Sequence, residues 1–152
     1  MFYLITYATH DERYFKFIKY RVHKVLGFGT KWNGFHDKVK AVIEFCDSVN
    51  SDDIVCVVDG FDSMILGTDQ EILNAYKSIG HDLVFSKEKT VKDTPFAQYT
   101  MFRNFGPCLE NKLNAGLYIG SAKTISNFWN DLKAGEDDQK YACIKNPYVD
   151  KE

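Results

Sequence analysis

The sequence predicts a single α/β domain whose mostly parallel central sheet is flanked by helices. Short hydrophobic segments, rich in β-branched and aromatic residues, alternate with segments whose apolar residues recur at helical spacing. The length of 152 residues suits one domain, and no repeat, low-complexity tract or linker divides it. A hydrophobic content of 45% is enough for one core, and 26% of charged residues argues against a disordered chain. We therefore treat residues 1–152 as one domain.

The first 35 residues predict a strand, a helix and a loop. Residues 2–7 are short and rich in β-branched and aromatic side chains, which is typical of a buried strand. Thr9 and Glu12 fit a capping box, and apolar residues recur at helical spacing over 14–26, so we expect a helix there that ends at the next glycine. The segment 27–35 holds three glycines and a tryptophan and is predicted to be a loop.

The middle of the chain predicts two helices and two strands. Apolar residues at helical spacing over 39–46 indicate an amphipathic helix, and 53–59 is a hydrophobic strand that ends in an acid. Thr68 and Glu71 form a second capping box, which opens a helix that Gly80 ends. A further short strand is predicted over 82–85.

The last third has weaker patterns. We expect mostly loop with some helix over 86–111 and a strand at 117–119, which the chain enters through residues 114–116. A helix is predicted over 124–132, and a short one over 137–143. In such α/β sheets, ligands gather at the carboxyl ends of the strands.

Charge and cysteine usage narrow the class of protein. A net charge of −2 excludes a generally basic nucleic-acid binder, so we expect no nucleic-acid partner. No two of the four cysteines form a CxxC pair, which excludes a zinc ribbon and a thioredoxin-type motif. These cysteines are Cys46, Cys56, Cys108 and Cys143.

The sequence shows no targeting or membrane signal. Its longest apolar run, Ile54 to Val58, is far shorter than a membrane helix, so no membrane span is expected. Residues 1–8 lack a basic start and a long apolar stretch, and they indicate a strand and not a signal peptide. We expect a cytoplasmic protein, or one associated with a host cell or virion.

The sharpest chemical signal is the run Val57–Asp62, which closes a buried strand with two carboxylates. Asp59 and Asp62 are oxygen ligands of the kind that Mg²⁺ and Mn²⁺ prefer, and such cations often share them with a substrate's phosphates. Gly60 allows a sharp turn and close approach of a ligand. A solvated turn with helix-capping aspartates explains the same pattern equally well.

Three further segments carry candidate site residues. Asn114 heads a run of small residues before a strand, which fits a sugar-binding amide or an ordinary turn. Asp137 and Asp138 lie in an acidic helix start, which fits helix capping or a carboxylate aimed at an acceptor hydroxyl. Trp32 fits either a ring that stacks on a sugar or base, or a partly buried anchor for its glycine-rich loop. That loop matches neither a dinucleotide fingerprint nor a Walker motif.

Taken in order, these segments resemble the glycosyltransferase domain of the procollagen lysyl hydroxylases, which is related to collagen galactosyltransferases and bacterial lipooligosaccharide glycosyltransferases. The resemblance covers nearly the whole chain. It is carried by Tyr7–Thr9, Leu26–Trp32, the helix with Lys38 and Lys40, Val58–Asp62, Leu83–Ser86, Leu113–Gly120 and Asp137–Gln139.

The resemblance implies a GT-A fold, a UDP-sugar donor and Mn²⁺, with Mg²⁺ as the alternative cation. It assigns the metal to Asp59 and Asp62, and it places Asp59 against the donor as well. Phe61, where the family usually has tyrosine, would stack near the uracil, and Trp32 would lie near the donor.

The resemblance also assigns residues to the nucleoside and to catalysis. The first strand would approach the nucleoside with Thr6, Ala8 and Thr9. The catalytic positions would be Asn114, Asp137 and Asp138, which face the donor sugar or orient the acceptor hydroxyl.

The chain departs from this family at its C-terminal end. The family continues into a segment whose histidine is a third protein ligand of the metal, but no histidine follows His81 here. We therefore expect a chain that is shortened at its C-terminus or is a fragment. Without a hydroxylase domain or secretory signal, a microbial or viral source is expected.

The resulting functional hypothesis is an enzyme that moves glucose or galactose from UDP-glucose or UDP-galactose to an acceptor hydroxyl. The acceptor would be hydroxylysine of a collagen-like protein, or a glycan, and a homo-oligomer stays open. The alternative is a non-catalytic member of the fold that binds nucleotide-sugar or a protein. A haloacid-dehalogenase-type phosphatase is not supported, because it needs Asp-x-Asp and Phe61 stands where the second aspartate would be.

Overall fold

The computed structural model describes residues 1–87 and 113–132. In this part of the chain, five strands form one sheet in the order β2-β1-β3-β5-β4. The strands are β1 Phe2–Tyr7, β2 Lys24–Leu26, β3 Ile54–Asp59, β4 Leu83–Lys87 and β5 Leu113–Ser121. The helices are α1 Phe15–Ile18, α2 Phe35–Ser48, α3 Asp69–Ile79 and α5 Ala122–Asp131.

The sheet is mixed, and a single strand accounts for this. β1 pairs in parallel with both β2 and β3, whereas β5 pairs antiparallel with both β3 and β4. Four strands therefore run in one direction, and β5 lies reversed between β3 and β4. This confirms the predicted α/β class with a mostly parallel sheet flanked by helices. The reversed strand brings residues 113–116 toward the carboxyl end of β3.

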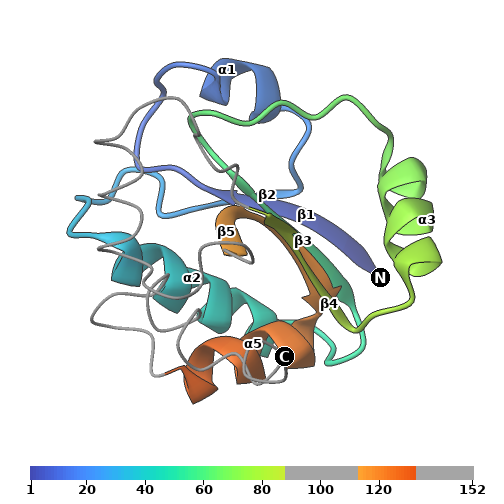
Figure 1. The fold of residues 1–152 in the computed structure, drawn as a ribbon. Coiled ribbons are helices and arrows are strands. Elements are labelled where there is room, and N and C mark those ends of the chain that lie inside the picture. Colours follow the sequence, from blue (N-terminus) through green and yellow to red (C-terminus); the bar gives the residue numbers. More distant parts are fainter. Residues whose placement is uncertain (88–112, 133–152) are drawn as a thin grey trace, which may run out of the picture.

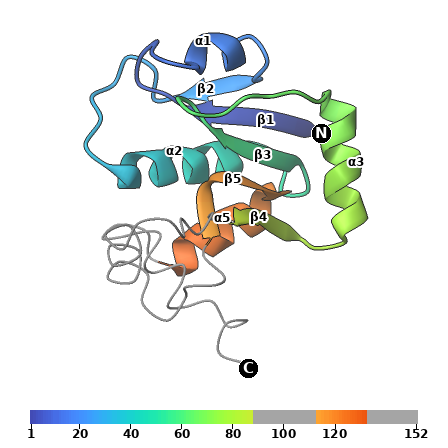
Figure 2. The ribbon, with the colours of Figure 1, turned by 45° about the horizontal axis from the view of Figure 1, so that its top comes forward.

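Helices cover both faces of the sheet (Figures 1 and 2). Alternate strand residues point to opposite faces, so Val55 and Val57 join the core beneath α2 and α5. Cys56 and Val58 join the second core, to which α1 and α3 contribute side chains. No residue of α3 is buried, so this second face is less fully covered.

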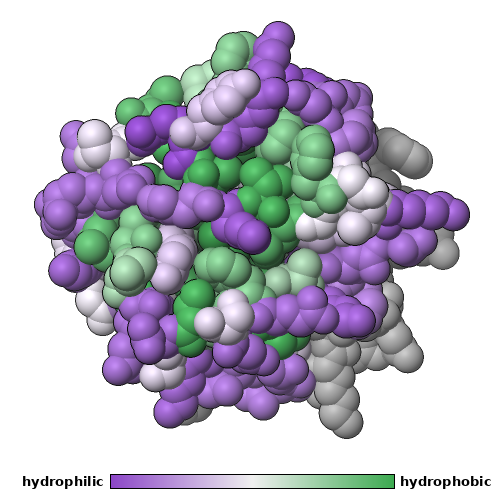
Figure 3. Space-filling model, turned by 180° about the vertical axis from the view of Figure 1, so that it is seen from behind, coloured by the Kyte–Doolittle hydropathy of each residue, from purple (hydrophilic) through white to green (hydrophobic). Residues whose placement is uncertain are grey.

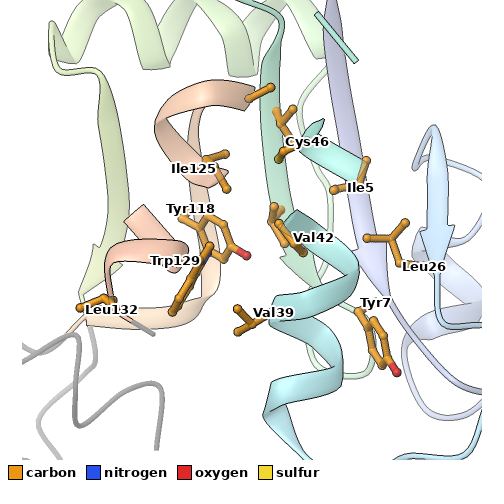
Figure 4. Close-up of a cluster of buried hydrophobic side chains, with 13 residues drawn as sticks. Ile5, Tyr7, Leu26, Val39, Val42, Cys46, Tyr118, Ile125, Trp129 and Leu132 are labelled. Carbon is orange, nitrogen blue, oxygen red and sulfur yellow. The ribbon is translucent and has the colours of Figure 1, made fainter. Parts of the chain in front are cut away.

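The core beneath α2 and α5 is built on aromatic side chains (Figure 4). Trp129 of α5 is 1% exposed, and its ring centroid lies 5.7 Å from that of Tyr118. Phe85 stacks on Tyr118 at 4.9 Å, which joins β4 to β5 through side chains as well as backbone. Val39 and Val42 of α2 pack against this group. The interlocked rings fix α5 and β5 relative to α2.

The predicted helix over 14–26 is wrong in its second half. α1 ends at Ile18, and Lys24–Leu26 forms strand β2, which pairs with Ile5–Tyr7. Apolar residues at the end of the segment satisfy helical spacing, but the open edge of β1 offers them a ladder of backbone hydrogen bonds. This tertiary pairing overrides the local pattern.

The capping box predicted at Thr9 and Glu12 is also wrong. The residue before α1 is Tyr14, and it makes no side-chain capping bond. The Thr9 hydroxyl instead lies 2.8 Å from Nδ1 of His10. Arg13 adopts a positive φ of 52°, which directs the chain away from a continuous helix at this point.

The capping box at the start of α3 is confirmed. The Thr68 hydroxyl accepts a hydrogen bond from the Glu71 backbone N–H, and the Glu71 carboxylate accepts one from the Thr68 backbone. The bonds that the Thr68 backbone N–H and hydroxyl donate to the Glu71 carboxylate lower its pKa. Gly80 ends the helix with a left-handed φ of 73°, as predicted. The helices predicted from 39–46 and 124–132, and the strands predicted around residues 2–7, 53–59, 82–85 and 117–119, are also confirmed.

Substitution of Thr68 by alanine is expected to lower the free energy of unfolding by about 0.5–2 kcal/mol, because the Glu71 backbone N–H loses the hydroxyl oxygen that caps it. Urea denaturation measures the change. Thr68→Ser keeps the hydroxyl and is the matched control. Equal losses in the two variants would show that the hydroxyl contributes nothing.

Two predicted segments are not covered by the description. Apart from Ser86 and Lys87, which belong to β4, the predicted loop over 86–111 lies outside the described residues, and so does the predicted helix over 137–143. Within the described part, none of the helices has the length and apolar character needed to cross a membrane.

Candidate functional site

A cleft of about 350 Å³ opens where β1 and β3 end. These strands run in parallel with Tyr7 opposite Asp59, so their carboxyl ends meet at one edge of the sheet. The turn after β3 and the loop before α2 form the walls. The cleft is lined by Tyr7, Thr9, His10, Arg13, Trp32, Phe35, Lys38, Asp59, Gly60, Phe61 and Asp62.

The centre of this cleft is an ion pair between Lys38 and Asp59. The Lys38 ammonium donates to Oδ1 of Asp59 and, at 3.0 Å, to the backbone carbonyl of Ala115. The Lys38 side chain is only 9% exposed, whereas that of Asp59 is 37% exposed. Lys38 thus ties α2 to β3 and β5, and it places a positive charge at the floor of the cleft.

Strand β5 closes tightly against Asp59. The Gly116 backbone N–H donates to Oδ1 of Asn114 at 2.6 Å. A Cβ atom on Gly116 would lie 2.5 Å from Oδ2 of Asp59 and 2.7 Å from Oδ1 of Asn114. The two side chains therefore converge on the space that only a glycine leaves open. The structure brings the predicted residues Asp59 and Asn114 together, although they are far apart in sequence.

Gly60 makes the turn after β3 possible. A Cβ atom there would lie 2.6 Å from the Tyr7 carbonyl oxygen and 2.9 Å from Cβ of Ala8. Any side chain would push the turn away from the end of β1. The close approach sets Phe61 and Asp62 against the cleft beside Asp59.

Aromatic rings form two walls of the cleft. The Phe61 ring centroid lies 5.1 Å from that of His10, at an interplanar angle of 38°. Trp32 is 43% exposed and meets Tyr7 and Phe35 edge-on, at 5.7 and 5.5 Å between centroids. Trp32 is therefore partly anchored, and enough of its ring stays open for a planar ligand to stack on it.

The three residues predicted on the first strand differ in their placement. Thr9 lines the cleft. Thr6 and Ala8 are fully buried, and the Thr6 hydroxyl donates to the Val58 carbonyl at 2.7 Å. Their side chains do not line the cleft, so they shape the end of β1 from within. Asp137 and Asp138 lie outside the described residues.

A chain of hydrogen bonds continues from Thr9 along the rim. Nε2 of His10 lies 2.8 Å from the Glu12 carboxylate, while Nδ1 faces Thr9. The bond to His10 lowers the pKa of Glu12, with a smaller contribution from Arg13. Both ring nitrogens of His10 are thus engaged, which fixes the ring beside Phe61.

The carboxylates fit a cation that is shared with a ligand. In the described ranges, no group of three or more His, Cys, Asp or Glu side chains could enclose a metal ion. Asp59 and Asp62 supply two carboxylates, and Lys38 engages one oxygen of Asp59. Mg²⁺ is commonly held by one or two carboxylates together with substrate phosphates, and this donor set fits that arrangement.

Sequence reasoning missed the role of Lys38. It is a charged residue on the buried side of α2, next to Val39, and it is 7% exposed as a whole. A lysine within the apolar pattern of a helix is a signal, because buried lysines need a partner. His10, Arg13 and Phe35 were missed as well, since nothing in their local sequence points to the cleft.

A larger hollow, of about 430 Å³, lies beside α3, on the face of the sheet opposite to the one that α2 and α5 cover (Figure 3). Its lining contains no charged side chain. Cys56 lies there, and burial raises its pKa to about 12, so its thiol is not a nucleophile at neutral pH. Although it is larger, this hollow has no charged side chain that could bind a phosphate or a cation. The candidate site is therefore the cleft at Asp59.

The chain is similar to a known family of domains and to a curated mouse protein. The family model described as the PLOD GT domain matches residues 5–152. Procollagen-lysine,2-oxoglutarate 5-dioxygenase 2 of Mus musculus is 28% identical over 159 aligned residues, which cover 91% of this chain and 21% of that protein. The chain therefore spans about a fifth of the length of the relative it matches.

Proposed function

Because the chain belongs to the family of PLOD glycosyltransferase (GT) domains, we propose that it moves glucose or galactose from a UDP-sugar to an acceptor hydroxyl, with Mn²⁺ or Mg²⁺. The observation that carries this proposal is the Lys38–Asp59 pair at the cleft floor, with Asp62 beside it. The buried Lys38 ammonium and the two carboxylates lie at the carboxyl ends of parallel strands. Together they suit a diphosphate that binds with a divalent metal ion.

The aromatic walls suit the rest of the donor. Trp32 and Phe61 offer ring faces at the two sides of the cleft, which can stack on a planar base. Asn114 approaches Asp59 from β5 and supplies an amide beside the carboxylates. Asn114 does not line the cleft itself, but its approach to Asp59 supports a sugar-binding role beside the carboxylates.

In the proposed reaction, the bond between the anomeric carbon and the diphosphate oxygen breaks, and a bond to the acceptor oxygen forms. Lys38 holds a positive charge where the leaving diphosphate gains negative charge. A divalent cation, when bound, supplies further charge neutralisation as a Lewis acid. Asp59 and Asp62 would hold it, and the proton of the acceptor hydroxyl passes to a base. Asp137 and Asp138 are the proposed groups that orient this hydroxyl.

The proposed acceptor is hydroxylysine of a collagen-like protein, or a glycan. The name of the mouse relative connects that protein with procollagen lysine. A second candidate function is a binding module that holds nucleotide-sugar without turnover. It is favoured by the described residues around the cleft, where Lys38 already engages one oxygen of Asp59 and no group of three or more His, Cys, Asp or Glu side chains could hold a cation.

The test is a calorimetric titration of UDP with and without Mn²⁺, followed by an assay of UDP release. We expect Mn²⁺-dependent binding that Asp62→Ala removes and Asp52→Ala, on an exposed loop, leaves unchanged. UDP-glucose and UDP-galactose are then offered with a hydroxylysine peptide. Binding without turnover supports the binding module. No binding by a folded protein refutes both functions.

A further inference from the structure

One stretch of the chain has a charge unlike the rest. Residues 13–35 contain six basic residues and no acidic one, although the whole chain has a net charge of −2. All six are exposed except one, which is partly buried. They are Arg13, Lys16, Lys19, Arg21, Lys24 and Lys31. Such a block gives one side of the molecule a local positive field.

The same stretch carries the exposed aromatic rings. Among residues 1–87 and 113–132, every exposed Phe, Tyr or Trp lies between positions 14 and 35. They are Tyr14, Phe17, Tyr20, Phe28, Trp32 and Phe35, with exposures of 51, 55, 84, 58, 43 and 62%. Single exposed apolar residues are ordinary, but a group of six in one region marks an interaction surface. We call the exposed side chains of residues 13–35 the aromatic–basic surface.

Contacts connect this surface across α1 and the loop before α2. The Lys16 ammonium lies 5.0 Å from the centroid of the Phe17 ring, and Tyr14 lies beside Phe17 at 6.1 Å. Phe28 stacks on the buried Phe15 of α1 at 5.9 Å. Figure 2 shows α1 over the sheet at β1 and β2, and the segment from β2 to α2 passing the side where β1 and β3 end.

Neighbouring acids neutralise only part of this charge. Asp11 pairs with Lys19, and Glu12 pairs with Arg13. In the described part of the chain, Lys16, Lys24 and Lys31 take part in no ion pair. Arg21 forms no ion pair there either, but it donates to the Gly67 carbonyl at 2.7 Å. Among the described residues, these three lysines therefore have no acidic partner within the chain.

The surface continues into the candidate site. Trp32 and Phe35 belong to it and also line the cleft. A molecule that covers α1 and the loop can therefore reach Asp59 without leaving the surface. An extended polypeptide can follow this path, whereas a flat bilayer would contact only the outermost rings.

We propose that the aromatic–basic surface docks an acidic segment of the polypeptide that carries the acceptor hydroxyl. Carboxylates of the segment meet Lys16, Lys24 and Lys31, which steers the encounter. Its apolar side chains pack on Phe17 and Tyr20, as aromatic residues do at protein interfaces. The assignment of the partner as the acceptor rests on the proposed transferase function, while the binding of an acidic polypeptide does not.

The test measures binding of a labelled random copolymer of glutamate and tyrosine by fluorescence anisotropy. We expect the affinity to fall with salt, and to fall about tenfold in Lys16→Glu/Lys24→Glu, because exposed charges act through screened Coulomb attraction. Lys77→Glu/Lys123→Glu makes the same charge change on α3 and α5 and is expected to leave the affinity unchanged. Equal weakening by the two pairs would overturn the proposal, since only net charge would matter.

A second pair of variants tests the rings. Phe17→Ser/Tyr20→Ser removes exposed side chains, so folding is retained and circular dichroism checks it. We expect weaker copolymer binding and unchanged UDP binding. Binding to vesicles of phosphatidylcholine with phosphatidylserine, but not to the copolymer, would replace the polypeptide by a membrane and refute the proposal. Copolymer binding by a protein that binds no UDP would refute the transferase function and leave the docking surface standing.

Discussion

Replacement of Asp59 by asparagine is expected to remove most of the proposed glycosyl transfer and also to destabilise the fold. Transfer falls about 100- to 1,000-fold, because one carboxylate charge that holds the cation and donor is lost. Stability falls by about 1–3 kcal/mol, toward the lower value because Asp59 is partly solvated. The loss arises because Lys38 keeps its buried charge but loses its anion.

Asp62→Asn separates the two effects. Asp62 forms no ion pair with Lys38, so this variant is expected to lose transfer at nearly wild-type stability. Lys38→Met combined with Asp59→Asn removes the unpaired charge and restores part of the stability without restoring transfer. UDP release and urea denaturation measure the two quantities. If Asp59→Asn left stability unchanged, the pair with Lys38 would have no structural role.

Trp129→Ala is expected to have the largest effect on stability, about 3–5 kcal/mol. The side chain is 1% exposed and meets Phe128 and Tyr118 at 5.1 and 5.7 Å between ring centroids. Its removal leaves a cavity between α2, α5 and the sheet. The midpoint of urea denaturation should therefore fall steeply.

Trp129→Phe is the control for this prediction. Within residues 1–87 and 113–132, the buried indole N–H of Trp129 finds no hydrogen-bond partner, so substitution by phenylalanine is expected to remove little polar interaction. It keeps most of the apolar volume, and we expect a loss below about 1.5 kcal/mol. A loss as large as that of alanine would show that the indole N–H has an essential acceptor.

The elements that the sequence predicted correctly are those with local signals. Thr68, Glu71 and Gly80 define both ends of α3 within thirteen residues, and α2 follows from its apolar spacing. The end of α1 could not be found in this way. The residues of β2 fit a helix as well as a strand, and only their pairing with β1, almost twenty residues earlier, decides between them.

The candidate site shows the same division. Asp59 and Asp62 stand out because a sharp turn after a hydrophobic strand displays them together. Lys38 does not stand out, because its partner lies 21 residues further along the chain. The convergence of Asn114 on Asp59 depends on the reversed direction of β5, and hydrophobic patterns carry no information about strand direction.

The reversed strand has a consequence for synthesis on the ribosome. β4 pairs with β5, and β5 also covers the edge of β3, although β5 is the last of these strands to be made. Until it emerges, a nascent chain presents two unpaired strand edges, which invite association with other chains. The carbonyl of Ala115 that Lys38 binds arrives at the same moment. The sheet is therefore completed and the cleft floor assembled in the same step, when β5 is added to β3 and β4.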